Sequence, residues 1–145
     1  MADLKGANYK LAYVDVPSAR IPAGDVSGEL KICRDEHTFA AEATTADVIK
    51  MALKVPAGAR VIEAGIISPS LGTTGIMALG TATDPDALIA AADAGGQAVK
   101  ALAAAGAADL MKEVTAETFY QISFTANTQA ATGLKVQAYV IYQDY

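Results

Sequence analysis

The sequence contains few of the residues on which catalytic and metal sites depend: one cysteine, one histidine and no tryptophan in 145 residues. A single cysteine cannot form an intramolecular disulfide, and one histidine alone makes neither a zinc site nor a catalytic triad. No Gly-x-Gly-x-x-Gly, phosphate-binding loop or Gly-x-Ser-x-Gly motif occurs, which argues against nucleotide-binding and α/β-hydrolase functions. We therefore expect no enzymatic activity and no cofactor.

Positive charge is also scarce, because 11 basic residues stand against 16 acidic ones and the net charge is -5. This sign does not suit the neutralisation of phosphates, so no direct nucleic-acid binding is expected. Hydrophobic residues make up 52% of the chain and charged residues 19%, which excludes a disordered chain. A chain of this length buries a sizeable core, and we expect residues 1–145 to form a single domain.

No membrane segment and no secretory signal are expected. The amino terminus has no apolar run behind a basic start, so we expect the protein to remain where it is made until it is assembled. Residues 64–83 carry no charge, but four glycines, Pro69, two serines and four threonines make a membrane-spanning helix untenable. Two strands joined by a turn explain this stretch better.

Alternation of apolar and polar residues predicts several β-strands. The clearest case is residues 48–55, where the odd-numbered residues from Ile49 to Val55 are apolar and Lys50 and Lys54 lie on the other side. Similar patterns predict strands at residues 29–33, 60–67, 73–81, 118–125 and 134–142. The last of these has large apolar groups on both faces, which indicates a central strand or a strand with one face in a partner interface.

The alanine-rich stretch from Ala87 to Ala108, with twelve alanines in 22 residues, favours helix, although glycines interrupt it. Asp84 is a suitable helix N-cap, Pro85 suits the first helical position, and Asp86 supplies an acidic residue in the first turn. These three residues predict a short helix at about residues 85–94. Residues 97–111 fit either a second helix or a strand and loop. The expected fold is mainly β, an antiparallel, jelly-roll-like β-sandwich with one or two short helices in this insertion.

The first 28 residues differ from the rest of the chain. They contain two prolines, three glycines and two short apolar clusters, Leu11 to Val14 and Ile21, which are too scattered for a core of their own. Two interpretations stay open. The segment packs on the parent domain as a strand and loop, or it is an extended arm that reaches a neighbouring subunit, since a strand-like segment readily adds to a sheet edge.

Tyrosines are concentrated near the two termini, where four of the six occur. Tyrosine combines a large contact area with a polar tip and is enriched at interfaces, although rings that cap the core of a sandwich would explain the same pattern. The candidate partner-interface residues are Tyr9, Tyr13, Val14, Ile21, Tyr139, Tyr142 and Tyr145.

Three other groups of chemically active residues have simpler explanations. Cys33 and His37 are four residues apart, but no second ligand pair accompanies them, and a turn after a strand is expected there. The Asp84 and Asp86 carboxylates are assigned to helix capping, because the oxygen-rich spacing of a calcium loop does not continue. Acidic residues at 109, 113 and 117 would form a solvated face if that stretch were helical. We expect no metal site and no catalytic residue.

A family resemblance appears in the segment Thr45-Ala46-Asp47-Val48-Ile49 running into Val55-Pro56-Ala57-Gly58-Ala59-Arg60-Val61-Ile62. Together with Thr81-Ala82-Thr83-Asp84-Pro85-Asp86-Ala87 and the closing strands around Tyr120 and Val136, it resembles small virion proteins of tailed bacteriophages. Head decoration, or cement, proteins with a jelly-roll sandwich are the most similar in character. The resemblance covers residues 46–145, and residues 97–108 fit it less well.

This resemblance implies a non-enzymatic virion protein, made in the host cytoplasm, that binds the outer surface of the phage head. Its partner would be the major capsid protein, and a homo-oligomer, most often a trimer, would hold neighbouring capsid subunits together through several modest contacts. A phage tail, fibre or baseplate module and a carbohydrate-binding jelly roll are the alternatives. The absence of tryptophan, which stacks on sugars, argues against the last.

Overall fold

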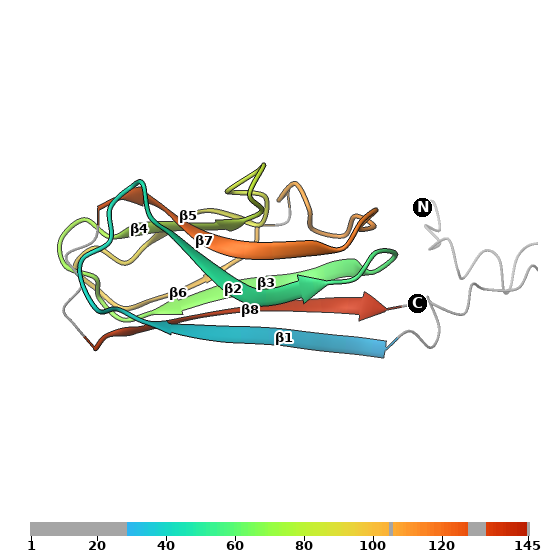
Figure 1. Ribbon diagram of the computed structural model, residues 1–145, viewed down its shortest axis with the longest axis horizontal. Coiled ribbons are helices and arrows are strands. Elements are labelled where there is room, and N and C mark those ends of the chain that lie inside the picture. Colours follow the sequence, from blue (N-terminus) through green and yellow to red (C-terminus); the bar gives the residue numbers. More distant parts are fainter. Residues whose placement is uncertain (1–28, 105, 128–132, 145) are drawn as a thin grey trace, which may run out of the picture.

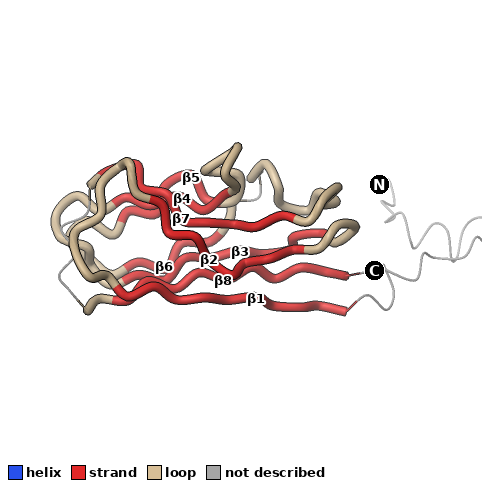
Figure 2. The backbone as a smooth tube through the Cα atoms, viewed as in Figure 1, coloured by secondary structure: helices blue, strands red, loops and turns tan. Residues whose placement is uncertain are grey.

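The alternating residues form eight β-strands in the computed structural model, which describes residues 29–104, 106–127 and 133–144. No helix occurs among these described residues (Figure 2). The strands are β1 (Glu29–Thr38), β2 (Val48–Val55), β3 (Arg60–Ser68), β4 (Ile76–Gly80), β5 (Ile89–Asp93), β6 (Val99–Leu102), β7 (Thr118–Ala126) and β8 (Lys135–Asp144).

The strands make two four-stranded antiparallel sheets that lie face to face (Figure 1). The strand order is β1-β8-β3-β6 in one sheet and β2-β7-β4-β5 in the other. Each strand of the first half pairs with one of the second half: β1 with β8, β2 with β7, β3 with β6 and β4 with β5. The chain is therefore a long hairpin folded into two layers, and it forms the expected antiparallel β-sandwich.

The core lies between the two sheets and follows directly from the alternation. In β2 the odd-numbered residues from Ile49 to Val55 are buried and the even-numbered ones are exposed, as the sequence predicts. Burial of one large aliphatic side chain stabilises the fold by about 1.5–3 kcal/mol, so these rows dominate its stability. Side chains with no exposed surface include Leu53, Val61, Ile66, Leu79, Tyr120, Ile122, Val136 and Val140.

Strand β8 is central in its sheet, between β1 and β3. It pairs with β1 over ten residues, from Glu29 opposite Asp144 to Thr38 opposite Lys135. Its even-numbered residues from Val136 to Val140 enter the core, and its odd-numbered residues lie on the opposite side of the sheet. Packing against the second sheet thus accounts for one of its two apolar faces, and the other face is directed away from the core.

The short helix predicted at about residues 85–94 is wrong, because Ile89–Asp93 form strand β5, paired with β4. Alanine favours helix by less than about 1 kcal/mol per residue, and an isolated helix of about ten residues is marginal in water. As a strand, the segment hydrogen-bonds to β4 and buries Ile89 and Ala92. Tertiary pairing outweighs local propensity here.

Asp84 does not cap a helix but belongs to the tight turn between β4 and β5. Its carbonyl oxygen accepts hydrogen bonds from the backbone N–H groups of Thr81 (2.8 Å) and Ala87 (3.3 Å). The turn lies so close to Gly80 that a Cβ there would collide with the Asp84 and Pro85 backbone. Glycine at position 80 is required by this close approach.

The uncertain stretch 97–111 contains strand β6, which pairs with β3 and forms an edge of its sheet, followed by turns. Because residues 109–117 are not helical, the acidic residues in this segment share no helix face. Asp109 instead accepts a hydrogen bond from the buried Tyr120 hydroxyl at 3.2 Å.

The uncharged stretch 64–83 contributes to β3 and β4, as expected. Residues 29–104, 106–127 and 133–144 include no helix that is long and apolar enough to cross a membrane.

Candidate partner interface

The side of the β1-β8-β3-β6 sheet that faces away from the core carries an unusual number of apolar side chains. We call this side the outer face. Its outward residues, read from the strand registers, form rows across the sheet. The rows are Ile32, Ile141 and Glu63; then Arg34, Tyr139, Gly65 and Leu102; then Glu36, Gln137, Ile67 and Lys100.

Four of the large apolar residues on the outer face are exposed: Leu30 is 67% exposed, Ile32 62%, Leu102 51% and Ile67 41%. They come from both edge strands and one central strand. Such residues scattered singly over a surface need no explanation, but a contiguous apolar group on one sheet face is typical of a contact surface.

Tyr139 lies at the centre of the outer face, and its ring covers Gly65 on the neighbouring strand. A Cβ atom at position 65 would lie 2.6 Å from the ring, so glycine is required for this packing. The Tyr139 hydroxyl donates a hydrogen bond to Glu63 Oε1 at 2.8 Å. Burial of the phenol and this carboxylate together raise the pKa of Tyr139 to about 12, so the ring is neutral at physiological pH.

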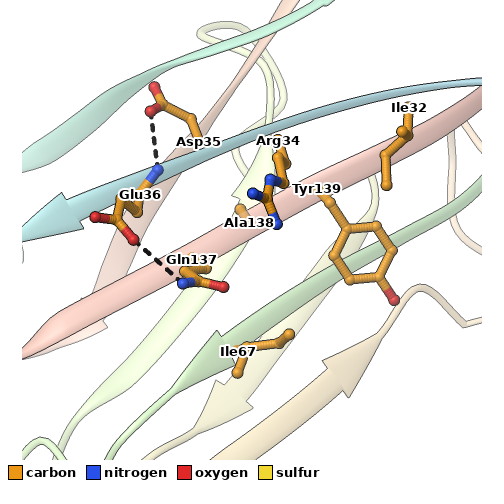
Figure 3. Close-up of a pocket in the computed structure, with 8 residues that line it drawn as sticks. All are labelled: Ile32, Arg34, Asp35, Glu36, Ile67, Gln137, Ala138 and Tyr139. Carbon is orange, nitrogen blue, oxygen red and sulfur yellow. Dashed lines mark hydrogen bonds between the residues drawn. The ribbon is translucent and has the colours of Figure 1, made fainter.

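A shallow groove of about 330 Å³ crosses the outer face between Tyr139 and the β1 edge (Figure 3). Figure 3 shows Ile32, Arg34 and Tyr139 beside one another, with Ile67 on the adjacent strand. Glu36 accepts hydrogen bonds from Lys135 Nζ (2.9 Å) and Gln137 Nε2 (3.2 Å). The bond and charge of Lys135 lower the pKa of Glu36, which keeps this carboxylate ionised at the end of the groove.

Arg34 borders the same groove and makes no hydrogen bond or ion pair with the part of the chain that the structure describes. An arginine offers five N–H donors in a planar fork, which match a carboxylate. The groove therefore combines the apolar side chains of Ile32, Ile67 and Tyr139 with a guanidinium whose charge also helps to lower the pKa of Glu36. This composition suits a peptide segment with apolar side chains and a carboxylate.

The outward side of the other sheet is different in composition. Outward residues of β2 and β7 are mostly polar or small, among them Lys50, Ala52, Gln121, Ser123 and Thr125. The exceptions are Val48, which is 45% exposed, and Phe119, which is 53% exposed and has Lys54 Nζ at 5.8 Å from its ring centroid. Exposed large apolar residues are thus more numerous on the outer face than on the other sheet.

The structure places two of the predicted interface residues in β8. Tyr139 lies on the outer face, whereas Tyr142 is partly buried and packs against the core on the other side of the strand. Tyr9, Tyr13, Val14, Ile21 and Tyr145 lie outside the described residues.

Sequence reasoning did not select the other apolar residues of the outer face: Leu30, Ile32, Ile67, Leu102 and Ile141. The double-sided apolar pattern of residues 134–142 was the available signal for Ile141, and the alternation at residues 29–33 was the signal for Leu30 and Ile32. Only the strand order brings these residues beside Ile67 and Leu102.

Cys33 and His37 do not lie in a turn, because β1 continues to Thr38. Four residues of strand separate them by about 13 Å, which is too far for a shared metal ion. The Cys33 thiol donates to the Val140 carbonyl at 3.6 Å, and the His37 ring packs edge-on against Phe39 at 5.3 Å. No group of three or more His, Cys, Asp or Glu residues that could hold a metal occurs in residues 29–104, 106–127 and 133–144.

Comparison with known proteins shows the same fold in bacteriophage capsids. One similar chain is in the capsid asymmetric unit of cyanophage Pam1, at 24% identity and a TM-score of 0.72, with 90% of this chain and 97% of that chain covered. A chain of the Ralstonia phage GP4 capsid has 22% identity and a TM-score of 0.68, with 87% and 90% covered.

A third similar chain is in the acidic stable capsid of Helicobacter pylori bacteriophage KHP30, at 14% identity and a TM-score of 0.56, with 79% and 87% covered. No family model and no curated protein matches the sequence. The chain therefore shares the β-sandwich fold of these capsid chains over most of its length.

Proposed function

We propose that this protein is a non-enzymatic structural component of a bacteriophage virion, and that it decorates the outer surface of the head. The observation that carries the proposal is the likeness to the Pam1 capsid chain, which extends over 90% of this chain and 97% of that one. Because nearly the whole of each chain is covered, the similarity is not limited to one supersecondary motif.

The surface of the molecule supports a structural role. Its apolar outer face is suited to contact with another protein, since exposed apolar residues gathered on one face mark interaction surfaces. Its groove is open, and within the described residues Cys33 donates a hydrogen bond to a backbone carbonyl and His37 packs against Phe39. These features favour assembly over catalysis.

The proposed partner is the major capsid protein. A homo-oligomer, with a trimer favoured, would engage several capsid subunits at once, so that modest contacts together give firm attachment. Binding only to the mature lattice would stabilise that lattice by mass action.

Co-sedimentation with phage heads that lack this protein tests the proposal. We expect the purified protein to pellet with the heads and to saturate at a fixed number of copies per head. Protein that stays in the supernatant at every head concentration would contradict head binding.

Immunogold labelling of intact virions separates the head from other locations. Gold over the head supports decoration, and gold along the tail or baseplate would assign the protein to a tail module instead. A mass measurement in solution, by light scattering coupled to size exclusion, tests the trimer directly.

A further inference from the structure

The groove on the outer face is shaped for an extended segment more than for a flat protein surface. It crosses the sheet from β1 to β3, with Ile32 and Ile67 on its sides and Tyr139 at its centre (Figure 3). A groove of about 330 Å³ accepts a few side chains at once. Alternate side chains of a strand point the same way, so an extended peptide presents such a row.

The chain itself contains a segment of matching chemistry ahead of Glu29. Residues 9–15 read Tyr-Lys-Leu-Ala-Tyr-Val-Asp, and in an extended conformation Tyr9, Leu11 and Tyr13 would share one side. Two tyrosines and a leucine supply large apolar area, which is the kind of side chain that anchors interfaces.

Charge at the end of this segment complements the groove. Asp15 ends the segment, and Arg34 at the groove makes no bond within the described part of the chain. An ordered carboxylate opposite Arg34 would satisfy the guanidinium with charge-assisted hydrogen bonds.

The length of the segment and its point of attachment allow it to reach another copy. The 28 residues join the domain at Glu29, the first residue of β1 and the margin of the outer face. Fully extended, the 14 residues from position 16 to position 29 span about 46–50 Å, whereas a ten-residue strand such as β1 spans about 33 Å. The segment is therefore long enough to cross its own domain and enter the groove of a neighbour.

We propose that residues 9–15 of one copy of this chain occupy the groove on the outer face of a second copy, between Ile32, Tyr139 and Ile67. Exchange of these segments joins the copies into a closed oligomer. The inference concerns contacts between copies in solution, so its test uses purified protein without phage heads and is independent of the proposed attachment.

Site-specific photocrosslinking tests the contact directly. Full-length protein carrying p-benzoylphenylalanine in place of Tyr13 is mixed with ¹⁵N-labelled unmodified protein, exchanged and irradiated, and the crosslinked peptides are identified by mass spectrometry. We expect light-to-heavy crosslinks from position 13 to peptides that contain Ile32, Ile67 or Tyr139. Crosslinks only within one copy, crosslinks to the other sheet, or none at all would overturn the proposal.

Charged substitutions on the groove give a second, independent measurement. Ile67→Lys and Ile32→Lys should each weaken self-association at least ten-fold in sedimentation equilibrium, because a lysine would be buried against the apolar segment. Phe119→Lys is the matched control, since Phe119 is an equally exposed apolar residue on the other sheet. Circular dichroism confirms that all variants are folded. Unchanged association in both groove variants, or equal weakening in the control, would refute the proposal.

Discussion

Ile66 and Ile67 are neighbours in β3, and their side chains lie on opposite sides of the sheet. Replacing each of them in turn by alanine therefore tests the core and the outer face separately. Ile66 has no exposed surface, and Ile67 is 41% exposed. Ile66→Ala removes Cγ1, Cγ2 and Cδ1 from the core, a loss of about 2.4 kcal/mol at about 0.8 kcal/mol per carbon. The cavity that remains adds about 1 kcal/mol. We expect the free energy of unfolding to fall by about 3–4 kcal/mol.

Urea unfolding measures this loss. Tyrosine fluorescence and far-ultraviolet circular dichroism follow the transition, because the protein has no tryptophan. All variants are compared at the same protein concentration, since self-association stabilises the folded state by mass action. The slope of the transition with urea must stay constant for the difference in midpoint to report stability.

Ile67→Ala is the matched control for the same assay. Its side chain is already partly in water, so we expect a loss of less than about 1 kcal/mol at a concentration where the protein is monomeric. The assignment of the two faces is refuted if Ile66→Ala costs less than about 1 kcal/mol or if Ile67→Ala costs as much as Ile66→Ala.

Three further predictions concern Tyr139, Gly65 and Cys33. Gly65→Ala should displace the Tyr139 ring and break its hydrogen bond to Glu63, and near-ultraviolet circular dichroism should show the changed tyrosine environment. Absorbance at alkaline pH should show Tyr139 ionising near pH 12, separately from Tyr120, whose pKa burial raises further, and Glu63→Gln should lower the pKa of Tyr139 only partly because burial is the larger cause. The Cys33 thiol should react slowly with a disulfide reagent in folded protein and rapidly in urea, since burial raises its pKa.

The alkaline titration also has a consequence for stability. The folded state holds the proton of Tyr139 more tightly than the unfolded state, so between pH 10 and about 12 the unfolded state binds fewer protons. The contribution of the neutral phenol to stability is therefore complete below pH 10 and declines as the pH rises toward 12. A free energy of unfolding that rises across this interval would contradict the assignment. Burial and the Asp109 carboxylate also raise the pKa of Tyr120, so Tyr139→Phe should reduce the decline but not abolish it.

Strands β2 and β7 could be predicted from the sequence because each buries one face only. Alternation between apolar and polar residues is then visible over eight or nine residues, and the predicted bounds agree with the structure within a residue. Strand β1 was predicted too short. Arg34 and Glu36 interrupt the apolar row that Leu30 and Ile32 begin, but both belong to the strand. On the other side of β1, the Asp35 carboxylate accepts a hydrogen bond from the Ala52 backbone N–H at 2.8 Å.

The candidate interface could be predicted only in part. Tyr139 was selected for its residue type, and its position over Gly65 depends on the β3–β8 register. Ile32, Ile67 and Leu102 are far apart in the sequence, and no local pattern indicates that they share a face. They meet because β8 lies between β1 and β3, and β6 lies beyond β3.

The sequence by itself determined the class of fold, since a two-residue apolar period can bury only one side of an extended chain and two such layers must then pack together. The tertiary structure alone decided the fate of the alanine-rich segment, because free hydrogen-bonding groups at the edges of β4 and β3 outweigh a small helix propensity. It also decided the composition of the outer face. Which strands lie side by side depends on long-range pairing, and that pairing is a property of the whole chain.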